Sequence, residues 1–357
     1  MARMHEHQRP SAAHSRRQVV GMLLTIVVLN VVGWGTLLLV VVPQDYRIGD
    51  AGVFGVGVGL TAFLLGARHA FDADHIAIID NATRKLVGEG KAARSTGLWF
   101  ALGHSSVVFG LAAVIALGVT AIAGPVQDAD SSLQHALGVI GSSAAGLFLV
   151  IVGLMNLSAL GGIIHARRHL HAGTFDEHQL EHHLHNRGFL ARIFGRVTRR
   201  IDKPWHLYPA GLLMGLGFDT ATQIALLVLA GGTAAYALPW YAVMVLPVLF
   251  TAGMVLGDSI DGVVMSRAYE WSSLDPARRI VYNMVVTTLS VLIALTIGTV
   301  LLLQLVADEL SPAWLTWVEK VNLDYVGFAI VAVFVAVWAT GVTVVGAARA
   351  RRATADA

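Results

Sequence analysis

Residues 66 to 81 combine imidazole, carboxylate and guanidinium groups in an otherwise apolar stretch, GARHAFDADHIAIIDN. Ionisable side chains inside a membrane cost about 2.5 to 3.5 kcal/mol each on insertion scales, so they are retained for function or paired internally. Imidazole and carboxylate together form a nitrogen and oxygen site that suits nickel, cobalt, copper or zinc. The alternative is an internal ion pair between Arg68 and Asp72, with the histidines bonded to neighbouring helices.

A continuous helix over residues 51 to 80 would present His69, Asp72 and His75 on one face, because successive side chains turn by about 100°. Asp74 would then lie on the opposite face. The residues alone therefore favour Asp72 over Asp74 as the carboxylate beside the two histidines.

The amino-acid composition indicates a membrane protein. The chain has 357 residues, of which 55% are hydrophobic and 13% are charged, whereas soluble domains carry about 25% charged residues. Cysteine is absent, which excludes disulfides, thiolate metal sites and CxxC redox chemistry. No GxxxxGK[ST] P-loop occurs in the sequence, so ATP hydrolysis by this chain is not expected.

Eight apolar segments predict an all-α polytopic membrane protein with eight transmembrane helices. They lie at about 18–42, 51–80, 96–124, 136–164, 207–231, 238–265, 280–306 and 323–348. The resulting organisation is a cytoplasmic tail at 1–17, four helices within 18–164, a hydrophilic loop at 165–206, four helices within 207–348 and a tail at 349–357.

The basic residues predict that both termini are cytoplasmic. Of the 25 Lys and Arg residues, only Arg47 and Lys320 fall in the predicted outer loops, and Arg68 lies within a helix. The others lie in segments that share one side with the termini, which is the cytoplasmic side by the positive-inside rule. The loop at 165–206 on that side is rich in histidine, and it could collect metal or be merely a solvated basic segment.

Further polar groups lie in other predicted helices. His104 belongs to a Gly-His-Ser-Ser stretch, and it either binds metal or is satisfied by a backbone carbonyl. Asp219 lies in the fifth helix, and Asp258 and Asp261 share a face of the sixth.

GxxxG spacings in the second, fifth and sixth helices predict that these three helices pack closely on one another. They involve Gly55 and Gly59, Gly211 and Gly215, and Gly253 and Gly257.

The element Phe71-Asp72 in the second helix recurs as Phe218-Asp219 in the fifth. These two helices run in opposite directions in the predicted topology. The recurrence therefore suggests an inverted repeat, with the site at the repeat interface, as in many secondary transporters.

Four stretches resemble motifs of one family. Residues 68–76, RHAFDADHI, continuing as IDNATRKL to residue 86, are similar to the HxxxxDH signature of the nickel/cobalt transporter (NiCoT) permeases. Residues 102–108 (LGHSSVV), 216–222 (LGFDTAT) and 249–254 (LFTAGM) also resemble motifs of that family, in the same order. The resemblance covers the second to sixth helices and the eight-helix plan.

The resemblance implies uptake of Ni²⁺ or Co²⁺ by a single-component permease of the cytoplasmic membrane, driven by the proton motive force. It implies that transport requires His69, Asp74 and His75, and that the path is lined by His104, Asp219, Asp258 and Asp261. Gln223 departs from the family, which usually has Glu there, and this removes one carboxylate ligand or proton carrier. A break in the second helix would reconcile the importance of Asp74 with the helical position of Asp72.

The expected partners are the transported divalent metal ion and the lipid bilayer, with no permanent cofactor, no nucleic acid and no ATPase subunit. One rival function is metal efflux, for which the histidine-rich loop would collect cytosolic ions. A rival from another class is an intramembrane metal-dependent hydrolase, which would need an activated water beside a base. The sequence favours a transporter over an enzyme and does not rank nickel against cobalt.

Overall fold

The computed structural model describes residues 12–47, 53–116, 132–171, 201–216, 238–272, 276–310 and parts of 314–343. Within these residues the chain is almost wholly helical, and extended pairing is limited to an isolated bridge between Arg47 and Val53. The main helices are α1 (Ala12–Thr36), α2 (Val56–His69), α3 (Ala73–Gly88), α4 (Thr96–Ala116), α6 (Ser132–His171), α9 (Tyr208–Met214), α11 (Trp240–Ser272) and α12 (Pro276–Leu310).

Several of these helices can cross a membrane. In the described part of the chain, five spans are long and apolar enough: Ser15–Gln44, Thr96–Ala113, Gly138–Ser158, Trp240–Glu270 and Thr287–Leu310. The protein is therefore an all-α, multi-pass membrane protein. The full count of eight helices, the cytoplasmic termini and the inverted repeat stay predictions, and Phe218 and Asp219 lie outside the described residues.

The fourth predicted helix is longer than expected. It was predicted to end near residue 164, but α6 ends at His171, so the first residues of the predicted loop are helical.

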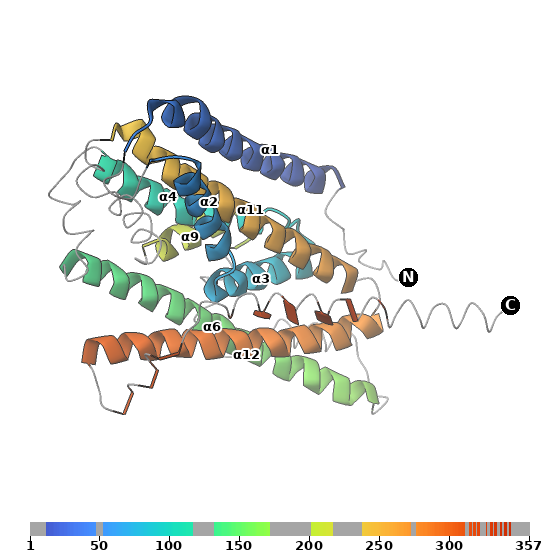
Figure 1. The fold of residues 1–357 in the computed structure, drawn as a ribbon. Coiled ribbons are helices and arrows are strands. Elements are labelled where there is room, and N and C mark those ends of the chain that lie inside the picture. The colour runs from blue at the N-terminus through green and yellow to red at the C-terminus, as the bar shows by residue number, and fades with distance from the viewer. Residues whose placement is uncertain are drawn as a thin grey trace.

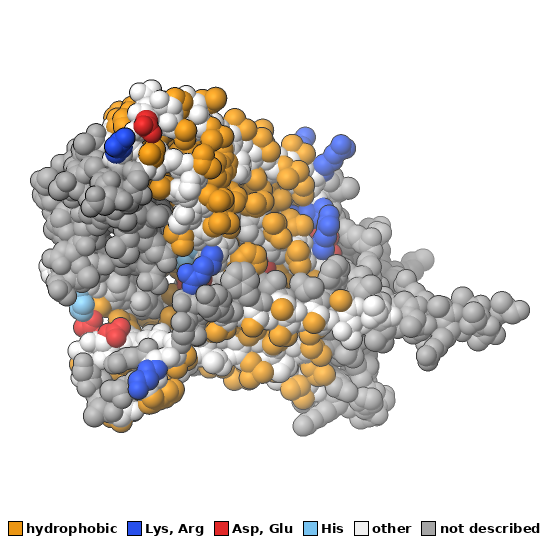
Figure 2. Space-filling view, in the orientation of Figure 1, with side chains coloured by type: hydrophobic (Ala, Val, Ile, Leu, Met, Phe, Trp, Pro, Cys, Tyr) orange, Lys and Arg blue, Asp and Glu red, His pale blue; other side chains and the backbone are white. Residues whose placement is uncertain are grey.

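The helices form two groups. Figure 1 shows α6 and α12 side by side, with α2, α3, α4, α9 and α11 gathered next to them and α1 on the outside of α11. Hydrophobic side chains cover the outward faces of α1 and α12 (Figure 2), including those of Leu24, Val31 and Leu292. Such faces suit contact with lipid chains.

Glycines allow α2, α4, α9 and α11 to pack closely. A side chain at Gly66 of α2 would overlap the backbone of Phe250 in α11, and one at Gly253 would overlap the backbone of Phe63. The predicted contact between the second and sixth helices is thus confirmed. In the described part of the predicted fifth helix, Gly211 of α9 packs on the Phe100 backbone of α4, whereas residues 217–231 lie outside the described part of the chain.

Candidate metal site

The helix predicted over residues 51 to 80 is interrupted where the chemistry is concentrated. α2 ends at His69, and α3 begins at Ala73. Asp72 precedes α3 in an extended conformation, with φ −66° and ψ 146°. Aspartate favours the position before a helix, where its charge interacts well with the exposed N–H groups. The prediction of one continuous helix was therefore wrong.

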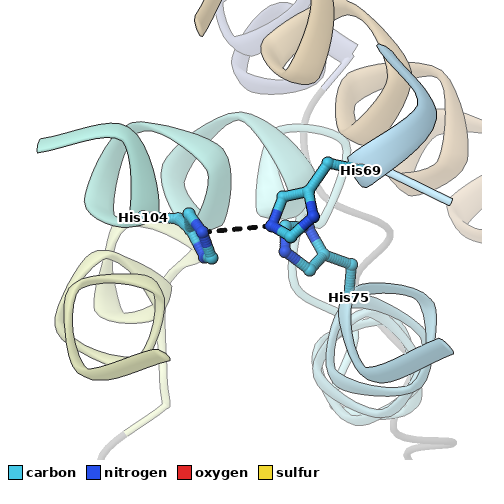
Figure 3. Close-up of side chains that lie close together, drawn as sticks. All are labelled: His69, His75 and His104. Carbon is cyan, nitrogen blue, oxygen red and sulfur yellow. Dashed lines mark hydrogen bonds between the residues drawn. The ribbon is translucent and has the colours of Figure 1, made fainter. Parts of the chain in front are cut away.

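Three histidines meet at this break. His69 comes from the end of α2, His75 from the first turn of α3 and His104 from the middle of α4, as Figure 3 shows. One ring nitrogen from each can be chosen so that all three lie within 4.8 Å of one another. His69 Nε2 lies 3.2 Å from His104 Nε2. His75 and His104 are buried, and the side chain of His69 is 11% exposed.

Two carboxylates contact the outer nitrogens of this histidine cluster, His69, His75 and His104. His69 Nδ1 lies 2.6 Å from Asp72 Oδ2. His75 Nδ1 lies 3.3 Å from both carboxylate oxygens of Asp258, which comes from α11. Carboxylates in this position fix the orientation of an imidazole and raise its basicity as a ligand.

The chemistry of the cluster fits a divalent metal ion. His75 Nε2 is buried and has no hydrogen-bond partner among the described residues. A buried polar atom without a partner usually has a functional explanation, such as a ligand or ion. Neutral imidazole is a good ligand for nickel, cobalt and zinc. The arrangement can therefore bind a transition-metal ion through nitrogen, with carboxylates close enough to balance its charge.

The helix break also shapes the electrostatics of the site. The C-terminal end of α2 carries partial negative charge, which favours a cation near His69. The N-terminal end of α3 carries partial positive charge, which disfavours one. Asp72 and Asp74 lie at that end and offset its charge, and the backbone N–H of His75 donates to Asp74 Oδ1 at 2.9 Å.

The structure therefore separates the predicted acidic residues by position. Asp72 and Asp258 contact histidines of the cluster, whereas Asp74 contacts the start of α3. Asp261 lies almost one turn beyond Asp258 on α11 and is buried. Asp219, the remaining predicted residue, lies outside the described part of the chain.

Two aromatic rings beside the cluster were not anticipated from the sequence. Phe100 packs edge-on against His75, with ring centroids 4.8 Å apart, and the Phe250 ring lies 5.9 Å from His69. Both phenylalanines are fully buried. Apolar residues inside apolar helices have no distinguishing pattern, so only the position of Phe100 four residues before His104 indicated its place.

The chain was compared with known proteins. The family model described as high-affinity nickel-transport protein matches residues 55–344. The nickel transporter NicT of Mycobacterium tuberculosis is 52% identical over 326 residues, covering 90% of this chain and 87% of that protein. No solved structure matches this chain.

Two further relatives extend the range of organisms and metals. The nickel transporter NixA of Staphylococcus aureus is 40% identical, covering 88% of this chain and 90% of that protein. The cobalt transport protein NhlF of Rhodococcus rhodochrous is 37% identical, covering 90% of this chain and 91% of that protein. These matches confirm the family resemblance of the motifs, and the chain belongs to the high-affinity nickel-transport protein family.

Proposed function

We propose that the protein imports Ni²⁺, Co²⁺ or both across the cytoplasmic membrane through the histidine cluster, driven by the proton motive force. The observation that carries this proposal is the meeting of three imidazoles at a break between α2 and α3, with His75 Nε2 buried and unpartnered. Broken helices that supply ligands at mid-membrane are typical of secondary transporters.

The histidine cluster suits transient binding of a hydrated ion. The ion would enter from the outer side and exchange water for the nitrogens of His69, His75 and His104. Asp72 and Asp258 would balance its charge while they orient two of the rings. Rocking of the two halves of the protein then opens the site toward the cytoplasm.

Proton coupling follows from the ligand chemistry. An imidazole must be neutral and a carboxylate ionised to bind a metal ion, so protons and metal compete for the same groups. Histidine changes its protonation in the physiological pH range. A proton gradient can therefore favour metal binding on one side of the membrane and release on the other.

The relatives support both the substrate and the class of activity. Those named above are called nickel or cobalt transporters, which favours these two ions over copper and zinc. The family consists of transporters rather than enzymes, so the intramembrane hydrolase considered from the sequence is not supported.

Uptake of ⁶³Ni²⁺ and ⁵⁷Co²⁺ tests the proposal. Cells that express the wild type should accumulate metal above vector controls, and a protonophore should abolish the difference. His69→Ala should behave like the vector. His135→Ala is a matched control, because His135 is 60% exposed and pairs with Glu309 away from the histidine cluster. Accumulation below vector controls would indicate efflux and contradict the proposal.

A further inference from the structure

Asp80 is a buried carboxylate that the proposed site does not use. It lies in α3, five residues beyond His75, and is 1% exposed. Tyr269 of α11 donates to its Oδ1, and Ser290 of α12 donates to its Oδ2 at 2.8 Å. A carboxylate therefore sits at the junction of three helices, in a place where an ionised group is costly.

Asp261 is a second buried carboxylate near Asp80. It is 5% exposed, and its Oδ2 has no hydrogen-bond partner within the described part of the chain. α11, which carries Asp261, packs against α3, and Tyr269 of the same helix donates to Asp80. A buried carboxylate oxygen without a partner usually has a functional explanation, such as a bound ion.

These carboxylates lie in a series that leads away from the histidines. A helix rises 1.5 Å per residue, which puts Asp261 about 4.5 Å beyond Asp258 along α11 and Asp80 about 7.5 Å beyond His75 along α3. Both helices run toward the side that the basic loops predict to be cytoplasmic. Arg84 lies one turn further along α3 and donates to Thr287 at 2.8 Å. Its positive charge marks the cytoplasmic end of this series of carboxylates.

Resting on the proposed function, we infer that Asp80 and Asp261 form a second cation site on the cytoplasmic side of the histidine cluster. An ion that leaves the imidazoles would be received by these oxygen ligands before its release. A carboxylate offers about four acceptor positions, so the hydroxyls of Tyr269 and Ser290 leave Asp80 able to bind a cation. Oxygen ligands hold nickel and cobalt less firmly than imidazole does, which permits release.

The uptake rate and the nickel affinity of Asp80→Asn together distinguish a second cation site from a role in maintaining the histidine cluster. The substitution keeps the shape of the side chain and removes its charge. Uptake of ⁶³Ni²⁺ at saturating concentration should fall at least about tenfold, while equilibrium dialysis of the purified protein should give a nickel affinity within about threefold of the wild type. Asp202→Asn, the same substitution in an exposed residue bonded to Lys91, should change neither quantity.

Two results would overturn the inference. Wild-type uptake in Asp80→Asn would show that its charge is not needed on the path. Loss of nickel affinity together with uptake would show that Asp80 merely maintains the histidine cluster. Absence of uptake by the wild type itself would instead contradict the proposed function, so the two failures are distinguishable.

A binding measurement with Mn²⁺ provides a second test that does not depend on transport. Mn²⁺ prefers oxygen ligands, and its electron paramagnetic resonance signal reports binding. His75→Ala removes one of the three imidazoles and serves as the starting protein, which should still bind Mn²⁺. The double variant His75→Ala with Ser290→Ala keeps the Asp80 charge and should bind Mn²⁺ as well. His75→Ala with Asp80→Asn should lose at least about tenfold in Mn²⁺ affinity. Equal affinity in all three variants would contradict the second site.

Discussion

The helices around the histidine cluster and the α6–α12 pair differ in how their backbones approach one another. Near the cluster, side chains built at Gly66 and Gly97 would overlap backbone oxygens of α11. In the pair, one at Gly146 would meet the side chain of Leu302 at 2.7 Å, and the closest backbone atom to one at Gly298 lies 2.9 Å away. Backbone contacts cannot yield as side chains do, so the cluster is held in the less adjustable region.

Polar contacts join the two regions through α3. Asn156 of α6 donates to Asn81, and Ser290 of α12 donates to Asp80. The N-terminal end of α3 carries His75, so the helix that begins in the histidine cluster is also bonded to the pair. We therefore expect substitutions near the histidine cluster to disturb the protein more than a substitution at Gly146 in the α6–α12 pair.

His75→Ala should produce the largest effect in the site region. It removes a buried imidazole and leaves the Asp258 carboxylate without its contact. Nickel affinity should fall by about 100-fold or more, since loss of an outer partner alone costs about 10- to 100-fold. Equilibrium dialysis with ⁶³Ni²⁺ measures the change, and an affinity near that of the wild type would remove His75 from the site.

Asp258→Asn should have the next largest effect. It keeps the shape of the contact to His75 Nδ1 but removes the charge that orients the ring. We expect a loss of about 10- to 100-fold in nickel affinity, measured by the same dialysis. An unchanged affinity would show that Asp258 does not support the imidazole.

Acidification should act on nickel binding in the site region. Free histidine titrates near pH 6.5, so lowering the pH from 7.5 to 5.5 should weaken nickel binding at least about tenfold as protons displace the metal. Thermal unfolding of the metal-free protein at both pH values serves as a control for loss of fold. Binding that is independent of pH across this range would contradict the imidazole ligands.

Paired glycine substitutions test the packing difference directly. Gly66→Ala would force Cβ into the Phe250 backbone and should destabilise the protein by about 1 to 3 kcal/mol or more. Gly146→Ala meets chiefly the flexible Leu302 side chain, with the nearest backbone atom, the Gly298 oxygen, 3.3 Å away. The helical preference of alanine offsets the crowding, so its effect should be within about 1 kcal/mol. Thermal unfolding in detergent compares them, and equal effects would refute the difference.

The smallest effect is expected at the loops. The hydrogen bond from Lys91 keeps the pKa of Asp202 below its ordinary value. A lowered carboxyl pKa adds stability above the ordinary pKa, near 3.9, and that stability is lost only as the pH falls through the lowered value. Between pH 5.5 and 7.5 the contribution should be constant. Asp202→Asn should therefore leave the pH dependence of thermal unfolding unchanged in this range, and a new slope there would contradict the assignment.

Much of the site could be predicted from the types and spacing of its residues. His69, His75 and His104 were recognised as ionisable groups in apolar helices, and the structure brings them together. The helix break could not be placed, because periodicity extends a helix through any residue that is not Pro or Gly, whereas α2 ends at His69 and Asp72 precedes α3. That break places Asp72 beside His69 and Asp74 at the start of α3.

Other features depended on contacts between distant parts of the chain. Asp80 was visible in the sequence, but its partners Tyr269 and Ser290 lie 189 and 210 residues away. GxxxG spacings predicted that the second, fifth and sixth helices pack on one another, but Gly211 and Gly215 of α9 pack on α4. Sequence patterns report local structure well, whereas partner choice depends on the whole arrangement of helices.

X-ray absorption spectroscopy of the purified protein with one equivalent of Ni²⁺ tests the central claim most directly. The account predicts imidazole nitrogen among the nickel ligands in the wild type, with a reduced imidazole contribution in His104→Ala. A ligand shell made only of oxygen atoms, or one identical in the two proteins, would contradict binding of nickel by the histidine cluster.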